Sequence, residues 1–175
     1  KYWGLNHIPG IIQYTVNGPL WLDSSWSRNF LDEVPTKIST VNFSGEDELE
    51  IFGMGWSHVE VNEAGISKRW SIAKKAELFL PLPAGKDLTL QFEVLKAPGL
   101  IDQVMSVRVN GELVGSRSLG DRVQIVTVTV PAQLITQPIS EVTLEFSKLK
   151  VPKTPNRRKI SVSFYQLEIY QLPDS

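Results

Sequence analysis

The residues whose side chains are best suited to binding a ligand lie between Gly55 and Trp70. The segment reads Gly55-Trp56-Ser57-His58-Val59-Glu60, continues through a short polar loop, and ends in Arg69-Trp70-Ser71. Indole rings offer flat apolar faces on which the C–H surface of a pyranose ring can pack, and carboxylate and guanidinium groups can hydrogen-bond ring hydroxyls. The candidate ligand-binding residues are therefore Trp56, Glu60, Arg69 and Trp70, joined by Asn156 and Arg158 from a later loop.

The same residues also have a structural interpretation. A core between two sheets needs large side chains, so both indole rings could be buried there, with Glu60 paired to Arg69 to join two loops. The exposure of Trp56 and Trp70 discriminates between the two interpretations. An open, aromatic-floored surface favours ligand binding, and full burial of both rings favours a scaffold.

Catalytic and metal-binding signatures are sparse in this chain. It has no nucleophile elbow, phosphate-binding loop or metalloprotease motif, and the separation of carboxylate pairs that glycoside cleavage requires is not visible in a sequence. We expect no enzymatic activity. The two histidines, His7 and His58, are too few for a zinc site unless they meet in space with a carboxylate, so we expect structural roles for both.

Composition and charge narrow the class of protein. The chain has 175 residues, of which 42% are hydrophobic and 21% charged, values typical of one folded domain with a full core. Its 18 basic and 19 acidic residues give a net charge of -1, so no long-range field attracts nucleic acid or an anionic membrane. The absence of cysteine excludes disulfides and thiolate metal sites. We expect the basic stretch Lys148–Lys159 to be a solvated loop, although it could contact phosphate or an acidic glycan.

The start of the chain indicates a segment of a larger protein. Lys1-Tyr2-Trp3 shows neither an initiator Met nor a signal-peptide pattern. No stretch approaches the roughly 18 apolar residues of a membrane span, so we expect any membrane anchor to lie outside this segment.

The elements that must position the candidate residues are predicted to be strands. From about residue 37 the hydrophobic pattern has a period of two, as in 88–95, where Leu88, Leu90, Phe92 and Val94 share one face. Asn110-Gly111 between two β-rich runs predicts a type I′ hairpin. The strand near Thr40 and the last strand, 160–170, are expected neighbours at a closing edge. Further strands are predicted over 76–82, 123–130 and 142–146.

These patterns predict an all-β fold, an antiparallel two-sheet β-sandwich of jelly-roll type over residues 37–175. Residues 1–36 are expected to be irregular and to pack on the sandwich. We expect them to contain one short helix, capped at Ser24 and ended by Pro35. The aromatic residues of this segment could instead form a binding platform or a seam with a missing domain.

Several strings of the chain together resemble galactose-binding-like jelly-roll domains appended to bacterial membrane glycosyltransferases and other envelope polysaccharide proteins. The resemblance covers roughly residues 45 to 172 and does not extend to about the first 40 residues. The strings that carry it are Gly55-Trp56, Glu60, Arg69-Trp70, the run 76–83, Val107-Arg108-Val109-Asn110-Gly111, and the run 155–162. This chain differs in the loop before the last strand, which reads Asn156-Arg157-Arg158-Lys159-Ile160-Ser161 where those domains have an Asp-Arg pair and a Leu-Gly turn.

The resemblance implies a non-catalytic module that binds or positions glycan for an attached glycosyltransferase, outside the cytoplasm of a bacterium. The implied partners are a glycan and the remainder of a membrane-embedded parent protein. No cofactor is implied, although sandwiches of this type often hold a structural calcium ion, for which Glu46-Asp47-Glu48 and Asp102 are candidate ligands. The alternative is a purely structural or protein-contact domain with no ligand of its own.

Overall fold

The computed structural model describes residues 7–8, 11–12, 34–45, 49–61, 65–152 and 158–173. The chain divides into two units, Lys1–Val34 and Pro35–Ser175. In the first unit β1 (His7–Ile8) and β2 (Ile11–Ile12) form an antiparallel pair. Residues 24–33 of the predicted helix lie outside the described residues, as do the aromatic residues before them.

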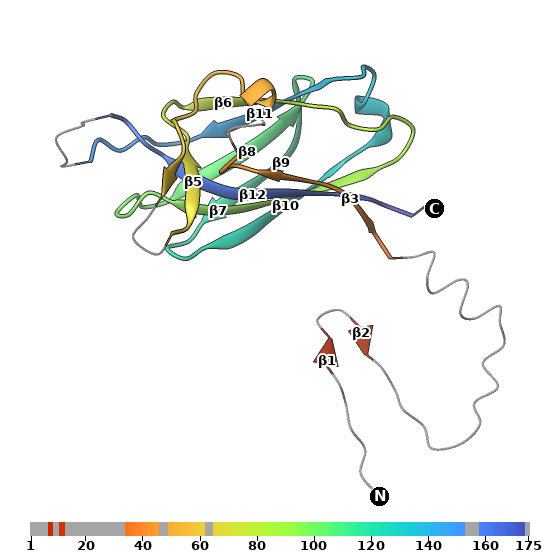
Figure 1. Cartoon of the computed structure of the whole chain (residues 1–175), viewed down its shortest axis with the longest axis horizontal. Helices are drawn as coiled ribbons and strands as arrows, with labels where there is room; N and C mark the ends of the chain where they lie inside the picture. Colours follow the sequence, from red (N-terminus) through yellow and green to blue (C-terminus); the bar gives the residue numbers. More distant parts are fainter. Residues whose placement is uncertain are drawn as a thin grey trace, which may run out of the picture. The chain divides into compact units, whose positions relative to one another are not determined.

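The second unit is an antiparallel β-sandwich (Figure 1). Its first sheet has the order β10-β7-β12-β5-β4, with β3 also paired to β12. Its second sheet has the order β6-β11-β8-β9. The bounds in the first sheet are β3 Thr36–Asn42, β4 Glu60–Val61, β5 Ser67–Trp70, β7 Leu88–Lys96, β10 Gln124–Val130 and β12 Val162–Gln171; in the second they are β6 Lys75–Leu80, β8 Gln103–Val109, β9 Glu112–Leu119 and β11 Ser140–Phe146.

The all-β, two-sheet prediction is confirmed. Helical geometry occurs within the described ranges only as two 3₁₀ turns, η1 (Leu49–Ile51) and η2 (Ala132–Leu134), so nothing there supports a helix. The same residues contain no helix that is long and apolar enough to cross a membrane.

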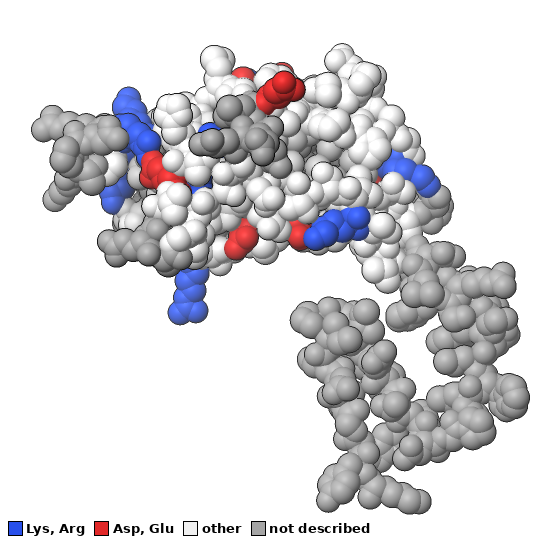
Figure 2. Space-filling model, in the orientation of Figure 1, with Lys and Arg blue, Asp and Glu red and all other residues white. Residues whose placement is uncertain are grey.

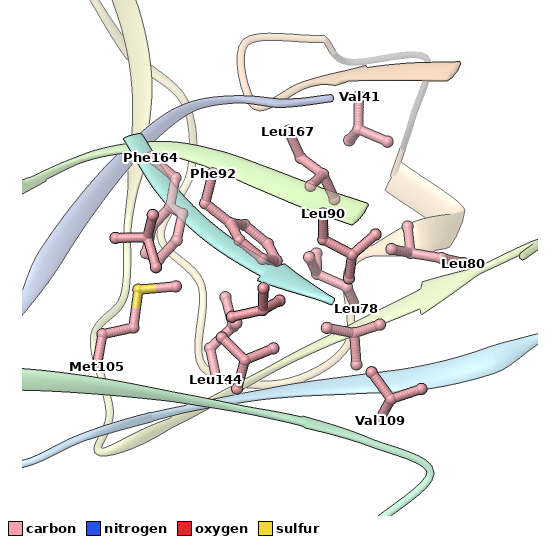
Figure 3. Packing of buried hydrophobic residues seen from close by; sticks show 14 of the residues in the cluster. Val41, Leu78, Leu80, Leu90, Phe92, Met105, Val109, Leu144, Phe164 and Leu167 are labelled. Carbon is pink, nitrogen blue, oxygen red and sulfur yellow. The ribbon is translucent and has the colours of Figure 1, made fainter. Parts of the chain in front are cut away.

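The core lies between the two sheets and follows the alternation of the strands. The predicted inward face of β7, formed by Leu88, Leu90, Phe92 and Val94, is completely buried. Figure 3 shows Leu90 and Phe92 packed with residues of the second sheet, including Met105 and Leu144. Each fully buried side chain of this size stabilises the fold by about 1.5–3 kcal/mol relative to an exposed one.

Two local predictions about pairing are also confirmed. Asn110 and Gly111 have φ values of 50° and 89°, the positive angles that a type I′ turn requires at both central residues, and they join β8 to β9. The strand near Thr40 pairs with the last strand, since β3 lies along β12 from Asn42↔Gln166 to Thr36↔Gln171.

A buried polar network joins the two sheets at one end of the sandwich. Gln103, at the start of β8, is completely buried. Its Nε2 donates to Oγ of Ser161 at 2.8 Å, next to β12, and its Oε1 accepts from the backbone N–H of Lys148 at 3.1 Å. Because buried amides are costly unless hydrogen-bonded, these bonds hold three separate segments together.

Candidate functional site

The segment 52–57 bridges the two sheets and carries the first candidate residues. On the second sheet the N–H of Gly53 donates to the carbonyl of Glu77 at 2.9 Å. On the first sheet the N–H of Ser57 donates to the carbonyl of Trp70 at 2.9 Å. The turn between them requires glycine at position 55, where φ is +91° and a Cβ atom would lie 2.2 Å from the carbonyl oxygen of Lys75.

Trp56 points from this bridge toward the core. Its half-buried indole packs among Phe43, Phe52 and Phe164, with ring centroids 5.2, 5.6 and 5.0 Å away. The indole Nε1 donates to the backbone carbonyl of Glu77 at 2.7 Å. Its polar atom and much of its apolar surface are therefore engaged within the sandwich.

Arg69 also faces the interior of the sandwich. In β5 it lies opposite Phe164 of β12, whose side chain is in the core, and it is only 4% exposed. Its Nη1 donates to the carbonyl of Ser57 at 3.0 Å, and its guanidinium carbon lies 4.5 Å from the ring centroid of Phe52. These contacts fasten β5 to the bridging segment.

Trp70, the next residue, points to the opposite face of the first sheet because side chains alternate along a strand. It lies opposite Ser163, is 7% exposed, and packs in a small second cluster with Ala97, Leu100 and Ile160. Trp56 and Trp70 therefore do not form one surface.

Charged groups surround Trp70 on this outer face, and we call Glu60, Lys68, Trp70 and Arg158 the Trp70 cluster. The indole Nε1 donates to Oε2 of Glu60 at 3.2 Å, and the guanidinium of Arg158 forms an ion pair with Oε1 of Glu60. Nζ of Lys68 lies 4.8 Å from the Trp70 ring centroid. Glu60 thus pairs with Arg158 and not with Arg69, so the pairing that the structural interpretation assumed is wrong.

The structure thus brings Glu60, Trp70 and Arg158 together on the outer face and places Trp56 and Arg69 on the inner side. Asn156 lies outside the described residues. The side chains of Glu60 and Arg158 are both about one-third exposed, at 36% and 31%. A ligand at the surface could reach both side chains.

The structure describes only part of the candidate metal ligands. Glu46, Asp47 and Glu48 lie outside those residues, and His58 and Asp102 are exposed. Within the described ranges, no group of three histidine or carboxylate side chains could hold a metal ion. The side chain of His7 is not described.

Charges on the described surface are mixed in sign. Figure 2 shows basic and acidic side chains scattered over a largely uncharged face. On the outer face of the first sheet the hydroxyl of Tyr170 donates to Glu168 at 2.7 Å, and Lys37 pairs with Glu168 at 2.9 Å. The hydrogen bond from Tyr170, followed by that from Lys37, lowers the pKa of the Glu168 carboxyl. In the basic stretch, the ammonium groups of Lys148 and Lys150 donate to backbone carbonyls of the 98–101 loop.

A feature that the sequence analysis missed lies on the outer face of the second sheet. It is a hollow of about 560 Å³, here called the β6–β11 hollow. The residues that line it come from β6, β11, the β8–β9 turn and the loop after η2: Phe79, Asn110, Thr136, Gln137, Ile139 and Glu141. One feature of the sequence could have indicated it. The alternation of Ala76, Leu78 and Leu80 places the aromatic residue Phe79 at an outward position.

Comparison with known proteins finds similarity at the level of structure only. No family model matches the chain, and no curated protein matches it by sequence. The CBM22-1 xylan-binding domain from Paenibacillus barcinonensis is similar with a TM-score of 0.53 at 11% identity, over 82% of this chain and 99% of that one. The N-terminal CBM22-1 and GH10 modules of endo-1,4-beta-D-xylanase 10B from Clostridium thermocellum, complexed with xylohexaose, match with a TM-score of 0.55 at 9% identity, over 81% of this chain and 30% of that one.

At this identity the likeness concerns the fold, because one fold serves many functions. The second unit shares a β-sandwich fold with these two structures.

Proposed function

We propose that this chain is a non-catalytic carbohydrate-binding or glycan-positioning module. The observation that carries the proposal is the fold. A domain named for xylan binding and a two-module structure complexed with xylohexaose each match it over more than four-fifths of this chain. The resemblance of the strings between Gly55 and the 155–162 run to envelope jelly-roll domains supports the same class. The finer proposal is an accessory module of a larger bacterial envelope protein such as a glycosyltransferase, located outside the cytoplasm.

The Trp70 cluster is the first place at which we propose ligand contact. Glu60 and Arg158 present a carboxylate and a guanidinium at the surface beside an indole, and both groups suit sugar hydroxyls. In this proposal Trp56 and Arg69 act from the inner side, by holding β5 and the bridging segment in place.

The same geometry favours a second candidate function, that of a structural or protein-contact domain. Trp70 is 7% exposed, and Glu60 beside it already pairs with Arg158 and accepts from the indole Nε1. A ligand would have to compete with these contacts, since a buried ring offers no face for a sugar to pack on.

Titration of the purified chain with neutral and acidic oligosaccharides separates the two functions. Binding is measured by calorimetry and by amide shifts in NMR spectra, with and without calcium. Saturable binding supports the carbohydrate-binding module. A flat response across the panel would leave the structural domain as the better description.

Glu60→Gln tests the Trp70 cluster within that experiment, because it removes the charge and keeps the size of the side chain. Glu50→Gln is a matched control, since Glu50 is an exposed carboxylate in η1. If the cluster binds the ligand, only the first substitution weakens binding.

A further inference from the structure

We propose that the β6–β11 hollow is a binding subsite for a neutral saccharide, with Phe79 as its apolar floor and Glu141 as its main hydrogen-bond acceptor. The inference rests on the proposed carbohydrate-binding function and gives that function a location. The hollow opens on the outer face of the second sheet, whereas Trp70 lies on the outer face of the first.

Phe79 supplies the aromatic surface. It pairs with Glu141 across β6 and β11 and is 38% exposed, a large exposure for an aromatic ring on a sheet. The ring rests against the bridging segment at Gly53, where a Cβ atom would lie 2.8 Å from its Cε2 atom. Ile139, 49% exposed, adds a second apolar side chain. Together they form a surface of the kind on which the C–H face of a sugar can pack.

Glu141 supplies the strongest acceptor. Its side chain is 45% exposed, and its Oε1 accepts from the Thr143 hydroxyl at 2.8 Å and lies 3.7 Å from Nζ of Lys75. No hydrogen bond within the described residues engages Oε2. That oxygen can accept a sugar hydroxyl in a charge-assisted bond, which is stronger than a neutral one. The side chains of Thr136 and Gln137 add neutral donors and acceptors to the lining.

Asn110 makes the hollow a preformed feature. Its Oδ1 accepts from the N–H of Glu141 at 3.0 Å, and its Nδ2 donates to the carbonyl of Leu134 at 2.7 Å. Its own N–H donates to the carbonyl of Glu141 at 2.8 Å. The β8–β9 turn, η2 and the start of β11 are therefore held together, which reduces the ordering cost of binding.

The lining selects the class of ligand. Among the described residues that line the hollow, Glu141 is the one ionisable group. The carboxylate of Glu141 would repel a uronate, sulfate or phosphate, and Lys75, whose Nζ lies 3.7 Å from Oε1, offsets only part of that charge because it also pairs with Glu77. The volume of about 560 Å³ lies within the roughly 300–1,000 Å³ typical of small-ligand pockets. These properties suit a neutral sugar unit.

The experiment titrates the full chain and four variants with xylohexaose, cellohexaose, mannohexaose and hexagalacturonate at up to millimolar concentration. Phe79→Ala and Glu141→Gln alter the hollow. Glu145→Gln is the matched control for charge, since Glu145 lies on the same face of β11 and is 43% exposed. Ile125→Ala is the control for an exposed apolar side chain on the other sheet. Thermal unfolding of each variant shows whether it is folded.

We expect a neutral hexasaccharide to shift the amide signals of residues 136–141 and to bind more tightly than hexagalacturonate. Phe79→Ala should weaken binding about tenfold or more, and Glu141→Gln about fivefold. Both controls should stay within about twofold of the original chain.

The other outcomes separate the two proposals. If a hexasaccharide binds, but the amide shifts fall elsewhere and both hollow variants bind as the original chain does, the subsite is overturned and the proposed function stands. Absence of binding by the original chain to all four probes overturns both.

Discussion

Replacing Trp56 with alanine measures how far this indole belongs to the core. The ring lies 5.0–5.6 Å from three phenylalanine ring centroids, and its Nε1 donates to the carbonyl of Glu77 at 2.7 Å. Truncation of a large buried aromatic residue to alanine costs about 3–5 kcal/mol. Because Trp56 is half-buried, we expect Trp56→Ala to lower the free energy of unfolding by about 3 kcal/mol.

The hydrogen bond accounts for a separable part of this loss. Trp56→Phe keeps an aromatic ring and removes the N–H, so it should lower the free energy of unfolding by about 1 kcal/mol. Equilibrium urea unfolding followed by far-UV circular dichroism measures both values, with the m-value as a check on two-state behaviour.

Met54→Ala is the control for this series. Met54 lies two residues earlier in the same bridging segment and is 75% exposed, so its truncation should change the free energy of unfolding by less than about 0.5 kcal/mol. If the free energy of unfolding of the Trp56→Ala variant lies within about 1 kcal/mol of that of the original chain, the assignment of this ring to the core is refuted. Loss of saccharide binding without loss of stability would assign it to a binding surface.

Three further predictions use the same unfolding measurement. Gly55→Ala should lower the free energy of unfolding by about 2–4 kcal/mol, because a Cβ atom would clash with the carbonyl of Lys75 at a positive φ; an unfolding curve unchanged from the original would show that the turn can relax. Gln103→Leu should lower the free energy of unfolding by about 1–3 kcal/mol, since it leaves buried hydrogen-bonding partners unsatisfied. An unchanged free energy of unfolding would mean that the network contributes little to stability. For Glu168, whose pKa the Tyr170 hydroxyl lowers below the ordinary 4.5, the stabilisation is present above pH 4.5 and is lost as pH falls through the folded-state pKa. The Glu168→Gln variant should therefore have a lower free energy of unfolding than the original chain near neutral pH, and this difference should shrink in acid. A difference that stays constant with pH would contradict a stabilising role of the Glu168 charge.

Much of the architecture could be predicted because side-chain direction along a strand is local information. The alternation in 88–95 identified the buried face of β7, and Asn110-Gly111 identified the β8–β9 turn from the backbone angles that the two residues tolerate. The short strands β4 and β5 escaped prediction because two- and four-residue strands are too short for periodicity to show.

The candidate site was less predictable, because Arg69 and Trp70 are neighbours in the sequence but not on the surface. Once the 67–70 segment is a strand, adjacent side chains must point to opposite faces. Which of them enters the core depends on the pairing of Phe164 with Arg69 and of Ser163 with Trp70. The partner strand is more than ninety residues away, as the Ser71–Val162 hydrogen bond shows, and the residue types of the motif do not encode that register.

The sequence by itself determined the all-β class, the alternating core faces, the main hairpin and the closing edge, since these depend on local periodicity and turn chemistry. The tertiary structure decided which sugar-compatible side chains reach a surface. It buried the ring of Trp70 behind Glu60 and Arg158, turned Trp56 toward the core, and opened a hollow beside Phe79. The physical reason is that exposure is set by strand register and by the packing of distant segments, which act only when the two sheets come together.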